Sequence, residues 1–151
     1  MSDTKPIWRK PNDPAELNAR MADTMPGLLG IQLLEFGPDW LSAEMPVDRR
    51  HAQPAGILHG GASVVLSETL GSVACWMAAP EGMVCVGLEV NANHVAAVAV
   101  GQTVTAICRA LHIGRTTQVW QTEIRRADGK LACISRLTCA VIDTPTPGLP
   151  R

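Results

Sequence analysis

The chain has 151 residues, enough for one domain with a sizeable core, and a formal net charge of −1 from 13 basic and 14 acidic side chains. Because these charges are balanced and interspersed, the composition excludes the electrostatic footprint of a nucleic-acid-binding protein. Five cysteines stand singly in apolar runs without a CxxC pair. This pattern indicates reduced core thiols in a cytoplasmic protein and argues against a disulfide framework or a metal site.

The N-terminal part of the sequence predicts an arm followed by a helix. Residues 1–12 are polar with scattered prolines, and we expect them to form a flexible arm. Asp13 and Pro14 make a good helix start, because aspartate caps free N–H groups and proline suits the first helical position. This helix should end before Pro26.

The rest of the chain is β-like, apart from one central helix. The expected strands are 31–36, 40–47, 83–95, 103–112, 116–126 and 131–142. Asp128-Gly129 is a strong hairpin signal, and sequential hairpins imply an antiparallel sheet. Residues 144–151 have nothing to bury and are predicted to be a disordered tail.

The central helix is expected over residues 60–79, directly after a glycine-rich turn. The segment has no proline, is apolar on almost every side, and carries Glu68 as its only charged residue. A helix that is apolar all round is a buried helix. Because an unpaired carboxylate is costly to bury, Glu68 needs a functional explanation.

A membrane span is the alternative interpretation of this segment. Ser63, Ser67, Thr69 and Ser72 lie in its middle together with Glu68, and an acidic residue at mid-membrane costs about 2.5 to 3.5 kcal/mol on insertion scales. The sequence shows no second hydrophobic span and no signal-peptide pattern. We therefore expect no membrane, and a helix wrapped by a strongly curved sheet, with any uncovered face closed by another subunit.

The residues of the central segment carry a resemblance. Residues 53–62 read QPAGILHGGA and are followed by Glu68 and Ser72. This resembles the motif of the hotdog thioesterases of the 4-hydroxybenzoyl-CoA and phenylacetate type. The match extends through AEMPVD (43–48), VGLEVNANHV (86–95), LHIGRTTQVW (111–120) and SRLTCAVI (135–142). It is most similar to the branch with the 1,4-dihydroxy-2-naphthoyl-CoA thioesterase and its enterobactin-pathway proofreading relative.

The resemblance implies an α+β hotdog domain over residues 13–143, in which about six antiparallel strands wrap a long central helix. It also implies roles for five residues of the motif. Glu68 stands at the position of the catalytic carboxylate, which acts as nucleophile or as general base on water. The backbone N–H of Gly60 polarises the thioester carbonyl, which Gln53 helps to hold. Ser72 positions substrate or water, and His59 belongs to the same turn as Gly60.

Further positions match segments that contact substrate or coenzyme A in relatives. These are Gly61, Gly87, His94, Val95, Ala96, Ala97, His112, Gly114, Arg115 and Thr116. Relatives often carry a basic residue near position 96, whereas this chain has alanine there. Because an alanine side chain cannot bind a phosphate, we expect Arg115 or Arg109 to bind the phosphates of coenzyme A instead. We expect no cofactor, because coenzyme A is part of the substrate.

Spacing adds a constraint that is independent of the resemblance. Gly60 and Glu68 are eight residues apart, which is about 12 Å along a helix axis. The donor and the carboxylate of one chain are therefore too far apart to serve one carbonyl. Two such helices packed antiparallel would bring Glu68 of one chain to Gly60 of the other. We expect a homodimer with composite sites, and a dimer of dimers beyond it.

Plainer interpretations stay open for most of these residues. Glu68 could be a core carboxylate paired with Gln or Arg, the glycines only a tight turn, and Ser72 a packing residue. His94 and His112 suit strand ends as well as they suit a ligand site. The acyl pocket is expected to be a soft wall that includes Met21, Met25, Leu28 and Leu29.

The function expected first is hydrolysis of acyl-CoA, especially hydroxybenzoyl- or 1,4-dihydroxy-2-naphthoyl-CoA. The second enzymatic function that the sequence allows is that of a proofreading thioesterase acting on misacylated carrier protein. A non-enzymatic alternative is a domain that binds acyl-CoA without hydrolysing it, and the presence of Glu68 argues against this alternative. A hotdog dehydratase is disfavoured, because the central helix has no His–Asp pair.

Overall fold

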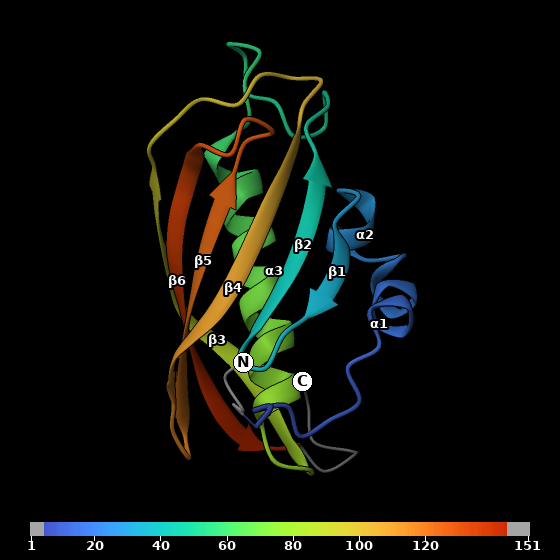
Figure 1. The fold of residues 1–151 in the computed structure, drawn as a ribbon, viewed down its shortest axis with the longest axis vertical. Coiled ribbons are helices and arrows are strands. Elements are labelled where there is room, and N and C mark those ends of the chain that lie inside the picture. The colour runs from blue at the N-terminus through green and yellow to red at the C-terminus, as the bar shows by residue number, and fades with distance from the viewer. Residues whose placement is uncertain (1–4, 145–151) are drawn as a thin grey trace, which may run out of the picture.

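The computed structural model describes residues 5–144, which form one long helix against a single six-stranded sheet (Figure 1). The elements are α1 (Pro14–Met21), α2 (Met25–Leu28), β1 (Gln32–Phe36), β2 (Trp40–Pro46), α3 (Gly60–Ala78), β3 (Met83–His94), β4 (Thr103–Ile113), β5 (Thr117–Arg125) and β6 (Leu131–Asp143). All pairings are antiparallel, in the order β1-β2-β4-β5-β6-β3. The α+β architecture expected from the sequence is confirmed.

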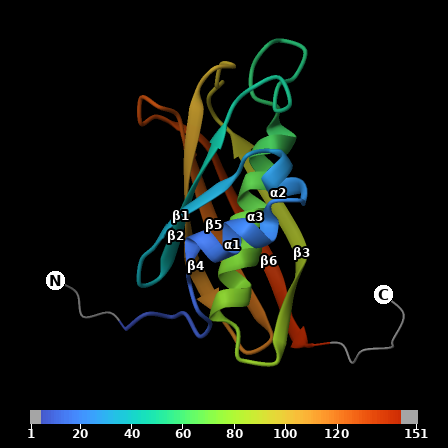
Figure 2. The same ribbon diagram turned by 90° about the vertical axis from the view of Figure 1, so that its right-hand side faces the viewer.

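Helix α3 lies in the concave side of the sheet and forms the centre of the core (Figures 1 and 2). Leu66, Leu70, Ala74 and Met77 are completely buried on its sheet-facing side. By length and composition α3 is a helix that could cross a membrane. Because most of it is packed inside the fold, α3 is the core helix of a globular domain.

Two details differ from the sequence-based expectations. The first helix ends before Pro26 as expected, but Pro26 also lies in the first turn of a second, short helix, α2, which was not predicted and where its missing N–H costs nothing. Strand β3 does not form a hairpin with β4; it crosses to the far edge of the sheet and pairs with β6. Residue pattern predicts a strand but not its neighbour, and the connection at 95–102 is too long for a tight turn. The hairpin at Asp128-Gly129 is confirmed, with Gly129 at a φ of 80°.

The residues that precede α1 pack against the domain, although the sequence predicts a flexible arm. The Trp8 ring stacks on the buried Trp120 ring, with centroids 5.9 Å apart, and its Nε1 donates to Gly37 O. Lys10 Nζ donates to Trp76 O at 2.6 Å and to Ala79 O at 3.0 Å. Lys10 thus satisfies carbonyls at the negative end of α3. The predicted tail lies outside the described residues, apart from Thr144.

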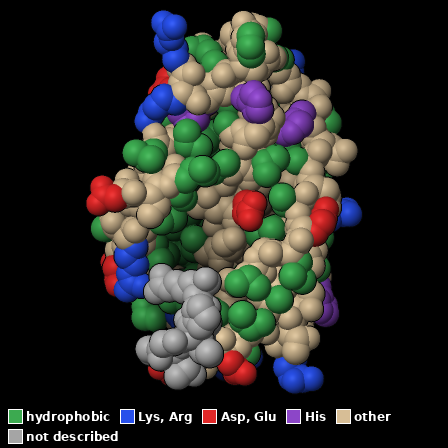
Figure 3. Space-filling view, turned by 180° about the vertical axis from the view of Figure 1, so that it is seen from behind, with side chains coloured by type: hydrophobic (Ala, Val, Ile, Leu, Met, Phe, Trp, Pro, Cys, Tyr) green, Lys and Arg blue, Asp and Glu red, His purple; other side chains and the backbone are tan. Residues whose placement is uncertain are grey.

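One face of α3 and one edge of the sheet stay uncovered. Glu68 is exposed, and its helix neighbours Thr69 and Ser72 are half-buried. Strand β3 is an edge strand of twelve residues with Val86 and Leu88 exposed at 43% and 62%. Figure 3 shows an acidic group near the middle of a face on which hydrophobic side chains are spread. Long apolar edges are normally covered in stable proteins, so these features favour the predicted second subunit.

Candidate active site

The turn before α3 is built so that backbone N–H groups face outward. His59 is the N-cap of α3, with extended backbone (φ −70°, ψ 133°), and its Nδ1 accepts a hydrogen bond from Gly61 N at 2.8 Å. The Gly61 N–H is therefore occupied by the cap. Among the described residues, no acceptor is found for the N–H of Gly60, the first residue of the helix. Gly60 thus presents a free donor at the positive end of the helix dipole.

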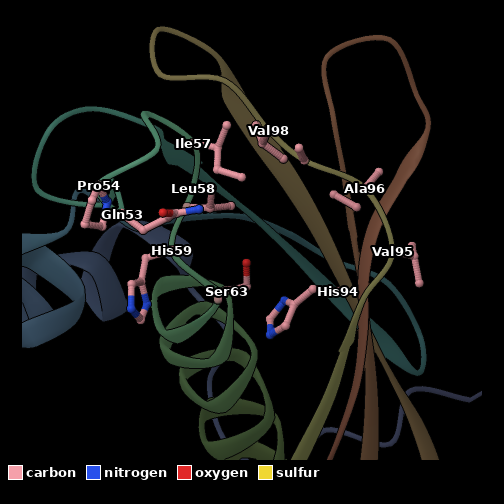
Figure 4. Close-up of a pocket in the computed structure, with 13 residues that line it drawn as sticks. Gln53, Pro54, Ile57, Leu58, His59, Ser63, His94, Val95, Ala96 and Val98 are labelled. Carbon is pink, nitrogen blue, oxygen red and sulfur yellow. The ribbon is translucent and has the colours of Figure 1, made fainter.

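A cavity of about 630 Å³ lies at this end of α3 (Figure 4). It is lined by Gln53, Pro54, Ile57, Leu58, His59, Gly60, Ser63, His94, Val95, Ala96, Ala97, Val98 and Ala132. The structure therefore brings together Gln53, His59, Gly60 and the segment 94–97, as the sequence predicts. Ser63 also lines the cavity but was not a candidate, although its position one turn after Gly60 was a signal for it.

The side chains around Gly60 leave room for a ligand and supply donors. A Cβ placed on Gly60 would lie 2.8 Å from His94 Nε2, so glycine is what allows the imidazole to approach the helix end. Figure 4 shows His94 pointing from the end of β3 toward this first turn. Gln53 Oε1 accepts from Ala55 N at 2.9 Å. No described residue accepts from the Gln53 amide nitrogen, which can therefore donate to a substrate carbonyl.

Glu68 lies apart from this cavity, in a second one of about 450 Å³. That cavity is lined by Met21, Met25, Pro26, Val65, Glu68, Thr69, Ser72 and Val73. Glu68 and Ser72 thus share one face of α3, and Met21 and Met25 form an apolar wall as expected. Leu28 and Leu29, predicted for the same wall, do not line it. Their backbone carbonyls bond instead to residues of the loop before α3.

The exposure of Glu68 corrects the expectation that its helix is buried all round. The sheet covers only one side of α3, and the carboxylate projects from the other. No ion pair or hydrogen bond joins Glu68 to another described residue, so it is not a core carboxylate paired with Gln or Arg. An unpaired carboxylate at a cavity is free to act on a ligand.

Gly87, a predicted substrate-binding residue, lies beside Glu68. A Cβ placed on Gly87 would lie 3.1 Å from Glu68 Oε1, which is closer than ordinary van der Waals contact. The backbone at Gly87 has no positive φ that would demand glycine. The missing side chain therefore serves to leave room for the carboxylate.

We expect Gly87→Ala to lower kcat by about tenfold, because displacement of a reacting group by a fraction of an ångström weakens catalysis steeply. The measurement is steady-state kinetics on an acyl-CoA substrate, with the melting temperature recorded beside it. The same substitution in a Glu68→Gln background is the control, since no reacting carboxylate is left to displace and the added methyl should cost no further activity. If kcat of Gly87→Ala equals that of the wild type, the proposed contact has no bearing on catalysis.

The remaining predicted contacts with coenzyme A are not brought to either cavity of the same chain. His112 lies near the end of β4, and Gly114, Arg115 and Thr116 form the β4–β5 turn, at the end of the molecule where α3 finishes (Figure 1). A Cβ on Gly114 would lie 2.6 Å from His112 Nε2 and 2.8 Å from Thr117 O, so this glycine has a structural role in the turn.

The two alternative phosphate ligands differ in their surroundings. Arg109 lies on the outer side of the sheet, 3.9 Å from Asp39 and over the Trp40 ring. Arg115 is exposed in the β4–β5 turn. Arg109 is therefore the weaker candidate of the two, because its charge already has a carboxylate partner.

The cysteines lie outside the two cavities. All five cysteines are free, and none lines either cavity. Burial raises the pKa of Cys108 to about 12 and also raises the pKa of Cys133. Such thiols stay protonated at neutral pH and are poor nucleophiles.

Comparison with known proteins gives similarities over nearly the whole chain. The profile described as "Thioesterase superfamily" matches residues 55–133. The chain is 47% identical over 136 residues to the 1,4-dihydroxy-2-naphthoyl-CoA hydrolase of Escherichia coli (strain K12), covering 90% of this chain and 99% of that one. It is 44% identical over 136 residues to the proofreading thioesterase EntH of Cronobacter turicensis, covering 90% and 98%. The crystal structure of thioesterase HI1161 from Haemophilus influenzae matches with a TM-score of 0.89 at 44% identity, covering 94% and 99%.

Proposed function

The chain belongs to the thioesterase superfamily, with the hotdog fold and the activity of a thioester hydrolase, and from this we propose that it hydrolyses acyl-CoA, aryl-CoA foremost. The observation that carries the proposal is the arrangement of two cavities along α3. One holds free donors at the helix N-terminus, and the other holds the unpaired carboxylate of Glu68 with an apolar wall. Thioester hydrolysis requires both kinds of group.

In the proposed mechanism the thioester carbonyl oxygen accepts hydrogen bonds from the Gly60 N–H and the Gln53 amide. Both hydrogen bonds become stronger as negative charge develops on that oxygen, and this lowers the free-energy barrier to hydrolysis. Glu68 either attacks the carbonyl carbon or removes a proton from the water that attacks it. In the first case the C–S bond breaks to give an acyl–Glu68 anhydride and the thiolate of coenzyme A, and water then hydrolyses the anhydride. In the second case the hydroxyl from water replaces the thiolate directly. In both cases water supplies the hydroxyl group of the acid and the proton that the thiolate takes up. No cofactor is needed for these steps.

We propose that each site is composite. Since Gly60 and Glu68 of one chain lie about 12 Å apart along α3, one carbonyl cannot reach both. Antiparallel packing of two α3 helices across a two-fold axis would place the uncovered Glu68 face of one chain at the Gly60 turn of the other. The exposed apolar edge of β3 supports this arrangement, because Val86 and Leu88 would be covered by the same contact.

The acyl group is expected to be aromatic. The wall around Glu68 is made of Met21, Met25, Val65 and Val73, which is apolar, adaptable and without an aromatic ring. Such a wall gains about 25 cal/mol per Å² of apolar surface buried, so it favours large acyl groups over small ones. The relative named 1,4-dihydroxy-2-naphthoyl-CoA hydrolase supports the same choice.

The test is kcat/KM, followed by release of free thiol, for naphthoyl-, benzoyl-, hexanoyl- and acetyl-CoA. We expect the aryl substrates to be fastest, hexanoyl-CoA to follow, and acetyl-CoA to be at least tenfold slower, because it forfeits binding energy. If acetyl-CoA matches the aryl substrates, the argument from the apolar wall is wrong.

A second candidate is proofreading of misacylated carrier proteins, which the 44% identity to a relative named proofreading thioesterase favours. Both substrate classes present the same acyl thioester, and they differ only in what lies outside the cavity. Comparison of one acyl group on coenzyme A and on a carrier protein would separate the two. For either role we expect the enzyme in the cytoplasm, where its five free thiols stay reduced.

A further inference from the structure

The loop between β2 and α3 contains a histidine that the proposed mechanism does not use. The side chain of His51 is completely inaccessible to solvent. Histidine is rarely buried to this extent without hydrogen-bond partners for both ring nitrogens. The contacts of His51 link the end of α2 to the turn before α3, two segments that are separate in the sequence.

One ring nitrogen of His51 holds the end of α2. His51 Nε2 lies 2.7 Å from Leu29 O, and a carbonyl can only accept, so Nε2 carries the proton. Nδ1 lies 3.1 Å from Asp48 N and 3.1 Å from Asp48 Oδ1, so both ring nitrogens have partners. The neighbouring Arg50 donates to Leu28 O. Two consecutive side chains therefore hold two consecutive carbonyls where α2 ends.

Arg50 is itself fixed by a short-range ion pair. Its Nη2 lies 2.7 Å from Asp48 Oδ2, and its Nε lies 3.1 Å from Asp48 Oδ1. These bonds from Arg50 hold the pKa of Asp48 well below its usual range. Asp48 therefore stays ionised and orients the guanidinium toward Leu28.

The backbone of the same histidine holds the turn before α3. His51 O accepts from His59 N at 2.7 Å, and His59 is the N-cap that precedes Gly60. A single residue therefore contacts both the end of α2 and the turn with the free donor. Within α2, Met25 and Pro26 line the cavity around Glu68.

Helix α2 buries no side chain of its own, although Gly27 packs closely against the end of α1. It has four residues, none of them buried, and Met25 and Leu28 are exposed at 60% and 64%. A helix this short, without buried apolar area, has little stability of its own. The hydrogen bonds from Arg50 and His51 are the side-chain contacts that hold its C-terminal carbonyls, beside the backbone bond from Ile31 N to Pro26 O.

We propose that His51 is a positioning residue that holds the α2 wall of the acyl cavity in place relative to helix α3, which carries Glu68 of the same chain. The inference rests on the proposed function, and it concerns substrates whose acyl group reaches α2. Such a substrate touches Met25 and Pro26, so its orientation depends on where α2 lies. An acetyl group is too short to touch this wall, so the hydrolysis of acetyl-CoA should not depend on the hydrogen bonds of His51.

The experiment compares His51→Leu and His51→Gln with the wild type, on hexanoyl-CoA and acetyl-CoA. Leucine removes the donor to Leu29 O, and we expect kcat/KM for hexanoyl-CoA to fall about tenfold while that for acetyl-CoA changes less than about threefold. Glutamine keeps an N–H at the distance of Nε2 and should restore hexanoyl-CoA hydrolysis to within about threefold of wild type. An equal loss on both substrates, or no loss on either, would overturn the proposal.

Arg50→Met tests the same link without touching the core, since Arg50 is exposed. Arg49→Met is its matched control, because Arg49 is the adjacent exposed arginine and makes no side-chain hydrogen bond to the described residues. We expect a selective loss on hexanoyl-CoA for Arg50→Met alone. A wild-type enzyme inactive on every acyl-CoA would contradict the proposed function. An active wild type whose variants lose no selectivity would contradict only the role of His51.

Discussion

Replacement of Glu68 by glutamine should lower kcat by about 10² or more while the substrate still binds. The change keeps the volume of the side chain and removes its ability to attack or to accept a proton. Because Glu68 is exposed and has no partner among the described residues, no buried group is left unsatisfied by the substitution. Folding stability should therefore stay close to that of the wild type, and the loss should be confined to chemistry.

The measurement is steady-state kinetics on an aryl-CoA, together with the dissociation constant of a thioether analogue that cannot be hydrolysed. Glu35→Gln is the matched control, because Glu35 is another exposed carboxylate, on β1, far along the sheet from β3. We expect kcat of this control to stay within about twofold of wild type. Activity of Glu68→Gln within a few-fold of wild type would end the mechanism proposed for this site.

The fold could be predicted because its signals are local. The absence of proline and the nearly all-round apolar character of 60–79 identify α3, and β-branched runs separated by glycine identify the strands. The partner of β3 could not be predicted, since an apolar pattern does not say which strand lies beside it. The short helix α2 was missed because Pro26 ends a helix in one context and begins one in another.

The candidate site could be predicted in its parts but not in its arrangement. The glycine-rich turn and the lone carboxylate of Glu68 stand out in the sequence, and the structure places each at a cavity. The contact of Gly87 with Glu68 and the hydrogen bonds of His51 depend on residues distant in sequence. Such contacts appear only once the tertiary packing is known. The exposure of Glu68 likewise depends on which side of α3 the sheet covers.

If the sites are composite, two variants that are each inactive alone should restore activity when they form a heterodimer. The first is Glu68→Gln, and the second is Gly60→Pro, which removes the N–H proposed as the oxyanion donor. Proline suits this position, because Gly60 is the first residue of α3 and His59 before it has an extended backbone. A Cβ at this position meets only the far end of the His94 side chain, so the helix itself should form normally.

When the two inactive variants are unfolded, mixed and refolded together, the mixture should regain about a quarter of the wild-type activity. In random pairing, half of all sites take their carboxylate from the chain with intact Glu68, and half of these take their donor from the chain with intact Gly60. The measurement is specific activity of the mixture, with heterodimer formation verified by differently tagged chains. Each variant refolded alone is the control and should remain inactive. If mixing is complete and no activity returns, both groups serve one carbonyl within a single chain, and the distance between them along α3 must be closed by a movement of that chain.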